Sequence, residues 1–198
     1  EQALACKEVT KVIVSTDSIH IRDIALNAGA EVPFMRPKEF SSDYAAKWDV
    51  WKHALEFCDR YYDKPIDLYL DLDCTSPLRD VDDIYKAIEL FKKSKVDAVF
   101  SVCEARKNPY FNLVEEENGN LRISKKLQSS VVRRQDAPKV FEHVASIYVL
   151  SPNFIRKGNG LLSGKAIGYD IGESKSLDID SELDFELIEF LMKKKLEV

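Results

Sequence analysis

The residues of this chain whose types and spacing could do chemistry begin with two aspartates near its end. Asp178 and Asp180 alternate along a segment that is predicted to be extended, so their carboxylates point to the same side. Two carboxylate oxygens on one side are what a Mg²⁺ ion carrying phosphates needs. The same residues also fit a helix start, because Asp180 or Ser181 can cap it and Asp184 can complete a capping box. Spacing alone leaves both interpretations open.

A second acidic pair, Asp71 and Asp73, lies at the end of a predicted buried strand in the middle of the chain. The apolar run over 68–72 is bounded by prolines and turns polar at Asp73, Thr75 and Ser76. In open α/β sheets, ligands bind at this end of a strand. The two acids could share a cation with the first pair, hold a ribose hydroxyl, or stay solvated and bind neighbouring backbone amides.

Basic residues gather in one part of an otherwise acidic chain. The cluster consists of Lys125, Lys126, Arg133 and Arg134. A planar guanidinium can grip a carboxylate or a phosphate with two hydrogen bonds, and the alternative is a solvated basic face on a hairpin. Arg36, held before a proline at the end of a predicted strand, has the same two interpretations. The histidines show no metal-ligand spacing, and no catalytic triad can be recognised.

Strands and helices alternate along most of the chain, which predicts the frame that positions these residues. Strands are expected over 9–15, 31–34, 68–72, 97–102, 146–150 and 165–169, and helices after Ser18, after 41–43, after Asp80, over 152–156 and after Asp184. This alternation predicts an α/β fold with a mainly parallel twisted sheet and helices on both faces. Apolar residues at helical spacing are expected to be buried, namely Ile21, Ile24, Ala25 and Ala28 in one helix and Leu187, Ile188 and Leu191 in another.

The pattern changes between residues 104 and 145, where a predicted hairpin turns around 118–120. A short hairpin is only marginally stable alone, so we expect this arm to pack on something else, such as a second subunit. The rest of the chain shows no repeat or linker. Its 198 residues therefore fit a single domain that carries the arm.

Composition argues against several classes of protein. The net charge of −5 gives no basic footprint for nucleic acid, and no apolar run approaches the roughly 20 residues of a membrane helix. The four cysteines form no Cys-x-x-Cys pair, so we expect packed thiols in a reducing compartment, the cytoplasm. Cys74 is included among the packed thiols, because no basic partner stands near it in the sequence.

Six segments stand in a characteristic order over nearly the whole chain. They are Val14-Ser15-Thr16-Asp17-Ser18, the run from Gly29 to Pro37, Thr75-Ser76-Pro77-Leu78-Arg79, Arg134-Gln135-Asp136-Ala137-Pro138, Ile147-Tyr148 and Ile179-Asp180-Ser181-Glu182-Leu183-Asp184. Each segment is weak alone, but the ordered set resembles the acidic-sugar cytidylyltransferases, the family of N-acylneuraminate cytidylyltransferase.

The resemblance implies a nucleotidyltransferase fold of the GT-A or Rossmann-like kind. In the implied reaction, CTP and an acidic nine-carbon 2-keto sugar give a CMP-sugar and pyrophosphate. The resemblance places Mg²⁺ on Asp178 and Asp180 and makes Arg134 and Asp180 catalytic. The implied nucleotide-binding residues are Arg36, Lys47, Asp73, Thr75 and Ser76, and the implied sugar-binding residues are Lys126, Arg134 and Tyr148. A homodimer whose exchanged arms complete the neighbouring sites is also implied.

The chain departs from the family in ways that leave the substrate open. The family's opening strand and Arg-x-Gly-Ser-Lys-Gly phosphate loop would precede Glu1, so a fragment is expected, with almost no turnover in the absence of that loop. Asp73 replaces a glutamine, Lys47 a serine and Ala145 a glycine. The alternatives are a transferase for another acidic sugar (legionaminic acid, pseudaminic acid or Kdo) or another nucleotide, and a non-catalytic dimer that binds nucleotide in the same cleft.

Overall fold

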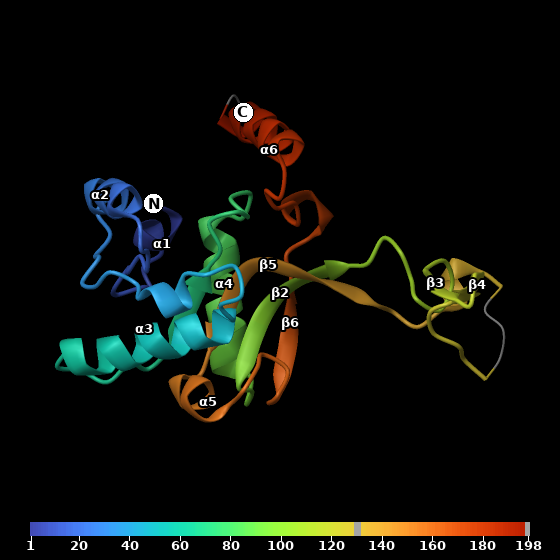
Figure 1. Ribbon diagram of the computed structural model, residues 1–198, viewed down its shortest axis with the longest axis horizontal. Helices are drawn as coiled ribbons and strands as arrows, with labels where there is room; N and C mark the ends of the chain where they lie inside the picture. Colours follow the sequence, from blue (N-terminus) through green and yellow to red (C-terminus); the bar gives the residue numbers. More distant parts are fainter. Residues whose placement is uncertain (129–131, 197–198) are drawn as a thin grey trace.

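The computed structural model describes residues 1–128 and 132–196, without the side chain of residue 196, and shows a four-stranded sheet between helices (Figure 1). The sheet has the order β1-β5-β2-β6, with β1 (Tyr69–Leu72), β2 (Ala98–Glu104), β5 (Phe141–Leu150) and β6 (Ala166–Asp170). β5 runs antiparallel to β1 and β2, and β6 is parallel to β2. Three strands therefore share one direction. β5 is reversed because the chain enters it from the arm and not through a crossover helix.

Helices cover both faces of this sheet, as predicted, because side chains alternate along each strand. The helices are α1 (Gln2–Ala5), α2 (Ile19–Asn27), α3 (Lys47–Tyr61), α4 (Val81–Lys93), α5 (Pro152–Lys157) and α6 (Glu182–Leu196), with the 3₁₀ turns η1 (Lys38–Phe40), η2 (Arg134–Asp136) and η3 (Glu173–Lys175). One face of the sheet packs Ile147 of β5 against Ile84 of α4. The other packs Tyr148 against Trp51 of α3 and Ile155 of α5. The predicted α/β class is confirmed.

The two strands predicted in the first part of the chain form only a single parallel bridge, between Ile13 and Glu31. Two backbone hydrogen bonds hold it, from the Val14 amide to the Glu31 carbonyl at 2.9 Å and from the Glu31 amide to the Val12 carbonyl at 2.8 Å. The pair lies outside the four-stranded sheet, so no neighbouring strand among the described residues extends its ladder. The prediction of regular strands over 9–15 and 31–34 is therefore wrong.

The helices of the first third agree with the prediction only in part. Ser18 caps α2 as predicted, because its hydroxyl accepts a hydrogen bond from the Ile21 amide at 3.3 Å. Only Ala25 of the predicted apolar face is buried, since Ile21 and Ile24 are 49% and 54% exposed and Ala28 is exposed as well. The predicted cap over 41–43 is also wrong, because α3 begins later. The Ser41 hydroxyl instead closes η1 by donating to the carbonyl of that turn's N-cap residue at 3.0 Å.

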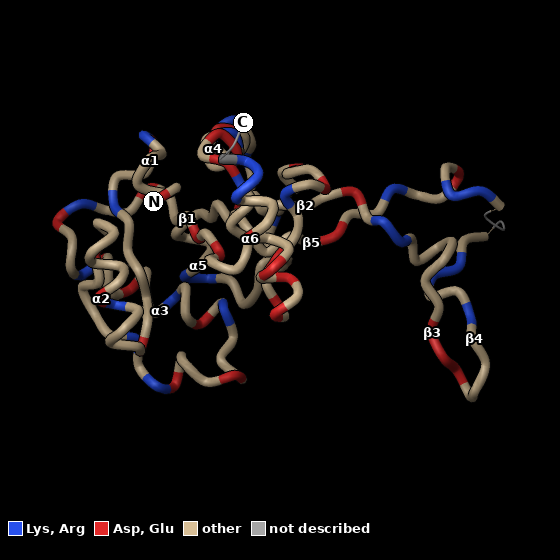
Figure 2. The backbone as a smooth tube through the Cα atoms, turned by 90° about the horizontal axis from the view of Figure 1, so that it is seen from above, with Lys and Arg blue, Asp and Glu red and all other residues tan. Residues whose placement is uncertain are grey.

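The predicted arm leaves the sheet between β2 and β5 and carries a hairpin well to one side of it (Figure 1). The hairpin strands are β3 (Val114–Glu117) and β4 (Asn120–Ile123). Asn118 and Gly119 form the turn with φ of 54° and 76°, the left-handed conformation that these residue types tolerate. β5 begins at Phe141, so the last residues of the predicted arm belong to the sheet, and residues 129–131 lie outside the described residues. Charged residues mark both connections of the arm (Figure 2).

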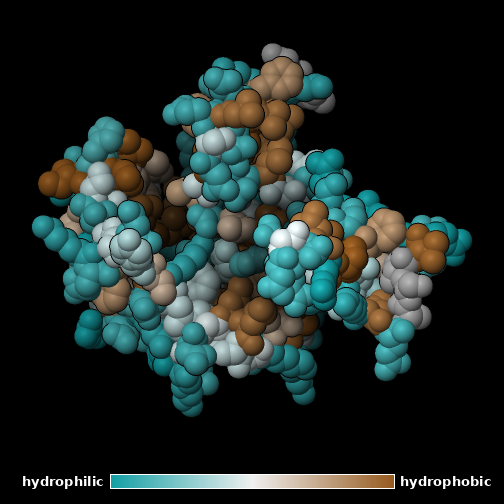
Figure 3. Space-filling model, turned by 45° about the vertical axis from the view of Figure 1, so that its right-hand side comes forward, coloured by the Kyte–Doolittle hydropathy of each residue, from teal (hydrophilic) through white to brown (hydrophobic). Residues whose placement is uncertain are grey.

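The last helix, α6, stands away from the sheet (Figure 1) and exposes apolar side chains (Figure 3). Ile188 is buried as predicted, whereas Leu187 is exposed and Leu191 only partly buried. The predicted three-residue buried face is therefore wrong, because only a narrow side of the helix meets the rest of the described chain. None of the helices in the described ranges has the length and apolarity of a membrane span.

Candidate functional site

The loop after β1 is held in place by a buried arginine, Arg79. Its Nη1 lies 2.7 Å from the carbonyl oxygens of Asp73 and Ser76 and 3.2 Å from that of Ser146 in β5. The Asp73 amide donates to the same Ser146 carbonyl at 3.1 Å. A charged donor that satisfies several buried carbonyls fixes them strongly. The loop therefore presents Asp73 and Thr75 at a defined edge of the sheet.

Lys47, the first residue of α3, lies between the two aspartates at the end of β1. Its Nζ is 3.0 Å from Asp71 Oδ2 and 2.5 Å from Asp73 Oδ2. The ammonium also lies over the ring of Tyr148, 4.3 Å from the ring centroid. Burial lowers the pKa of Lys47, but the charge of Asp71 and the hydrogen bond to Asp73 together outweigh burial and raise this pKa above its ordinary value. Lys47 is therefore a permanent cation at the strand tip.

The two C-terminal aspartates lie beside this strand tip. The Ile179 amide donates to the Thr75 carbonyl at 2.9 Å, which places the segment of Asp178 and Asp180 against the loop after β1. Partial burial raises the pKa of Asp178, as do the negative charge of Asp180 and, more weakly, that of Asp73. The two acidic pairs, predicted at separate places in the sequence, therefore belong to one site.

The divalent cation predicted on Asp178 and Asp180 stays a prediction, and the Asp180 carboxylate is available for it. Ser181 caps α6, because its hydroxyl accepts from the Asp184 amide at 3.3 Å and donates to Asp184 Oδ2 at 2.7 Å, so the Asp180 carboxylate is not needed as a cap. The described residues contain no group of three or more His, Cys, Asp or Glu side chains placed to hold a metal. A Mg²⁺ ion on these two carboxylates would complete its shell with water and phosphate oxygens, which is its common mode of binding.

Two of the predicted nucleotide-binding residues, Ser76 and Arg36, make no ion pair or side-chain hydrogen bond with the acidic pairs in the described part of the chain. Ser76 is fully buried and its hydroxyl has no partner among the described residues, so this position does not fit the predicted contact with a nucleotide. Arg36 Nη2 lies 4.0 Å from Asp17 Oδ1, and the Arg36 amide donates to the Thr16 carbonyl at 2.8 Å. These contacts tie Arg36 to the loop before α2, and its contact with a nucleotide stays a prediction.

The predicted sugar-binding residues divide between the sheet and the arm. Tyr148 is 3% exposed, and its ring makes a cation–π contact with the Lys47 ammonium. Lys126 is exposed on the arm. Arg134 lies at the base of the arm, where its Nη2 donates to the Ala105 carbonyl at 3.1 Å and where it lines a cavity of about 650 Å³. Within the described part of the chain, neither C-terminal aspartate lines this cavity, so Arg134 and the acidic pairs form separate groups.

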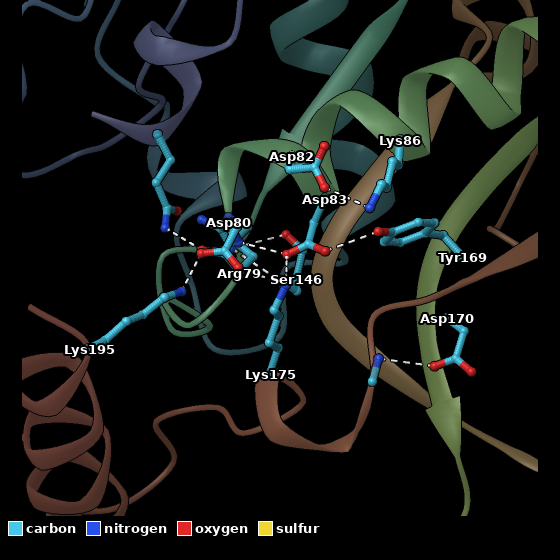
Figure 4. A network of polar contacts seen from close by, with 12 residues as sticks. Arg79, Asp80, Asp82, Asp83, Lys86, Ser146, Tyr169, Asp170, Lys175 and Lys195 are labelled. Atoms are coloured by element: carbon cyan, nitrogen blue, oxygen red, sulfur yellow. Dashed lines mark hydrogen bonds and ion pairs between the residues drawn. The ribbon is translucent and has the colours of Figure 1, made fainter. Parts of the chain in front are cut away.

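The sequence patterns did not reveal the residues that hold the site together. Lys175 Nζ lies 2.8 Å from Asp80 Oδ2 and 2.6 Å from Asp83 Oδ2 at the start of α4 (Figure 4). The predicted cap at Asp80 is confirmed, and its reciprocal bonds with Asp83 form a capping box. The spacing of Asp80 and Asp83, three residues apart, is a capping-box signal that can be recognised in the sequence. Nothing in the sequence points from Lys175 to an acid 92 residues earlier.

Known proteins match this chain over nearly its whole length. A family profile described as "Cytidylyltransferase" matches residues 1–195. The chain is 39% identical over 195 residues to post-translational flagellin modification protein B of Campylobacter coli, covering 98% of this chain and 82% of that protein. With the same coverage it is 36% identical to CMP-N,N'-diacetyllegionaminic acid synthase of Campylobacter jejuni subsp. jejuni serotype O:2. It is 29% identical to N-acylneuraminate cytidylyltransferase of Escherichia coli O18:K1:H7, covering 98% of this chain and 45% of that protein.

The fold also matches a solved structure, that of 4-diphosphocytidyl-2C-methyl-D-erythritol synthase from Anaerococcus prevotii. The TM-score is 0.64 over 97% of this chain and 82% of the other chain. The two sequences are 12% identical, so this similarity shows the fold alone.

Proposed function

Because this chain belongs to the cytidylyltransferase family, we propose that it transfers CMP from CTP to an acidic nine-carbon 2-keto sugar, an N-acylneuraminate or a related nonulosonic acid, and releases pyrophosphate. The family resemblance of the ordered segments is confirmed, and the chain is a nucleotidyltransferase. The observation that carries the proposal is the hydrogen bond from Ile179 to Thr75, which joins the C-terminal aspartates to the strand tip. A nucleotide bound there lies at the carboxyl end of β1, where α/β sheets bind ligands.

In this proposal, each side chain of the strand tip has a positioning task. Asp178 and Asp180 hold a Mg²⁺ ion, which supplies positive charge for the phosphate oxygens during transfer. Asp73 and Thr75 face the nucleotide, and Lys47 keeps the charge of the acidic tip in balance. The anomeric hydroxyl of the sugar attacks the α-phosphorus in line, so the protein orients the reactants and forms no covalent bond itself.

The arm supplies the sugar side of the site from a second subunit. In one chain Arg134 and Lys126 belong to the arm, apart from the acidic pairs. The hairpin leaves Leu121 70% exposed and Val114 half exposed, which is apolar surface that a homodimer with exchanged arms would bury. The Arg134 guanidinium would then grip the carboxylate of the sugar or a phosphate with two hydrogen bonds.

We also propose that the enzyme works in the cytoplasm. All four cysteines are free thiols, and reducing compartments keep thiols in this state. The cytoplasmic location stays a prediction.

Replacing Asp180 by Asn in the full-length protein tests the metal assignment. We expect CMP-sugar formation at saturating Mg²⁺ to fall at least about 100-fold, because one of two charged ligands is lost. Product is measured by chromatography. The matched control is Glu182→Gln, which removes the same charge from an exposed residue of α6 and should keep the rate within about two-fold. An unchanged rate in Asp180→Asn would refute the assignment.

A substrate panel separates the proposed reaction from its alternatives. CTP, UTP, ATP and GTP are each combined with N-acetylneuraminic, legionaminic and pseudaminic acids and with Kdo, and pyrophosphate release is measured. We expect release only with CTP and a nine-carbon acid. Release with another nucleotide, or with Kdo alone, would point to a related transferase. No release with any pair would favour the non-catalytic dimer.

A further inference from the structure

The segment that carries Asp178 and Asp180 has no regular secondary structure of its own. It runs from the end of η3 to the start of α6, after Gly172 has turned the chain out of β6 with φ of 81°. In its middle, the Ile179 amide bonds to the Thr75 carbonyl at 2.9 Å. The positions of the two carboxylates therefore also depend on what holds the two ends of the segment.

Lys175 fastens the first end of this segment to the start of α4 (Figure 4). Its Nζ bridges Asp80 Oδ2 at 2.8 Å and Asp83 Oδ2 at 2.6 Å. The Asp83 side chain is only 7% exposed, and it also accepts hydrogen bonds from the Asp80 amide at 2.7 Å and from the Tyr169 hydroxyl at 3.0 Å. Removing the cation from a buried carboxylate is costly, so this contact is a firm one.

The start of α4 is also joined to the loop after β1. Arg79 directly precedes Asp80, and its Nη1 holds the Asp73 and Ser76 carbonyls at 2.7 Å. Lys195, near the C-terminal end of α6, also pairs with Asp80, so the helix that follows the segment is tied to the same carboxylate. The capping box of α4 is thus a common anchor for the strand tip, for the first end of the segment and for the far end of α6 (Figure 4).

We propose that Lys175 is a positioning residue that fixes Asp178 and Asp180 against the tip of β1. It contacts neither substrate nor metal, and it acts through Asp80 and Asp83. This inference rests on the proposed function, because it takes the two aspartates as metal ligands. Without Lys175 the segment loses the tie at its first end, so the carboxylates spread over more arrangements and bind a cation more weakly.

Binding of Mn²⁺ to the full-length protein, measured by electron paramagnetic resonance, tests this inference without a turnover assay. Lys175→Met keeps the length of the side chain but removes the ammonium, and we expect the Kd for Mn²⁺ to rise about 10-fold. Lys175→Arg can still bridge both carboxylates and should restore the Kd to within about two-fold. The matched control is Lys86→Met, because Lys86 pairs with Asp82 at 2.6 Å on the same helix and is not part of the segment.

Asp80→Asn is a second variant, chosen because Asn caps a helix as well as Asp does while removing one of the charges that Lys175 bridges. We expect weaker Mn²⁺ binding here too. Circular dichroism shows which of Lys175→Met and Asp80→Asn is folded. If a folded variant of the two binds Mn²⁺ with the affinity of the parent, the inference is overturned. An equal loss in Lys86→Met also overturns it, since charge alone then explains the effect. Failure of the proposed function looks different, because Asp178→Asn and Asp180→Asn would then leave Mn²⁺ binding unchanged.

Discussion

At the scale of single residues, the strand tip balances opposite charges. Asp71 of β1 and Asp73 just after it face the same lysine, as their alternation predicted, and would repel each other if left alone. Lys47 offsets that repulsion by pairing with both carboxylates. The spacing of the two acids was readable in the sequence. The contact with a lysine 26 residues earlier was not, because it depends on how α3 packs against the sheet.

The cysteines provide a test of nucleotide binding at this residue scale. Cys74 is exposed, so its predicted packing is wrong, while Cys6, Cys58 and Cys103 are buried. We expect a maleimide to label Cys74 first near neutral pH, since burial raises the pKa of Cys58 to about 11 and keeps that thiol protonated. MgCTP should slow the labelling, because Cys74 stands between Asp73 and Thr75.

Mass spectrometry of the labelled protein follows each thiol separately. Cys74→Ser should remove the fast phase and leave the slow ones unchanged. Labelling of Cys58 as fast as Cys74 would contradict the burial of Cys58. No protection of Cys74 at CTP concentrations that occupy the protein would contradict the placement of the nucleotide.

At the scale of elements, an irregularity in β5 connects the sheet to the site. The pairing of β2 with β5 shifts register around Ser101. The buried Ser101 hydroxyl lies 2.7 Å from the Val144 carbonyl and accepts a hydrogen bond from the Ile147 amide at 2.8 Å. Ser146 lies between those two residues, and its carbonyl accepts a hydrogen bond from Arg79. The strand was predictable from its apolar run, but the bulge was not, because it depends on a partner strand.

Replacing Ser101 by Ala should therefore destabilise the fold. Two buried backbone groups lose a partner, and the expected loss in the free energy of unfolding is about 1–3 kcal/mol. Urea denaturation measures it. Ser94→Ala, at the C-cap of α4, is the control and should change this free energy by less than about 0.5 kcal/mol. Equal unfolding midpoints for Ser101→Ala and the parent would show that water or a shifted backbone replaces the hydroxyl.

The capping box of α4 gives this element a specific dependence on acid. Hydrogen bonds from Lys175 and Lys195 hold the pKa of Asp80 below its ordinary value. The stability from these contacts is present above the unfolded pKa of about 3.9 and is lost as pH falls through the lower folded pKa. Asp80→Asn should be less stable than the parent at neutral pH, and thermal unfolding should show the difference vanish once acid protonates Asp80 in both states. A difference independent of pH would contradict this origin.

At the scale of the whole molecule, the sequence predicted elements well where the pattern is local. The Asn118-Gly119 turn, the cap at Asp80 and the apolar run of β1 each depend on a few neighbouring residues, and each is confirmed. Most of the burial predicted for α2 and α6 was wrong, because apolar periodicity shows which face could be buried but not whether another element covers it. The same limit applies to the arm, because the sequence predicts that it packs on something else but does not show on what.

Mixing two inactive proteins tests whether the arm serves the neighbouring subunit. If Arg134 acts across the dimer, Arg134→Ala and Asp180→Asn subunits will form mixed dimers in which one site carries both changes and the other carries neither. Random pairing makes about half of the dimers mixed, so about a quarter of the parental CMP-sugar formation should return. A mixture of Asp178→Asn with Asp180→Asn is the control and should stay inactive, because both residues belong to the same side of each site. If sedimentation shows mixed dimers and the first mixture nevertheless stays inactive, Arg134 acts within its own chain and the exchanged arm loses its role.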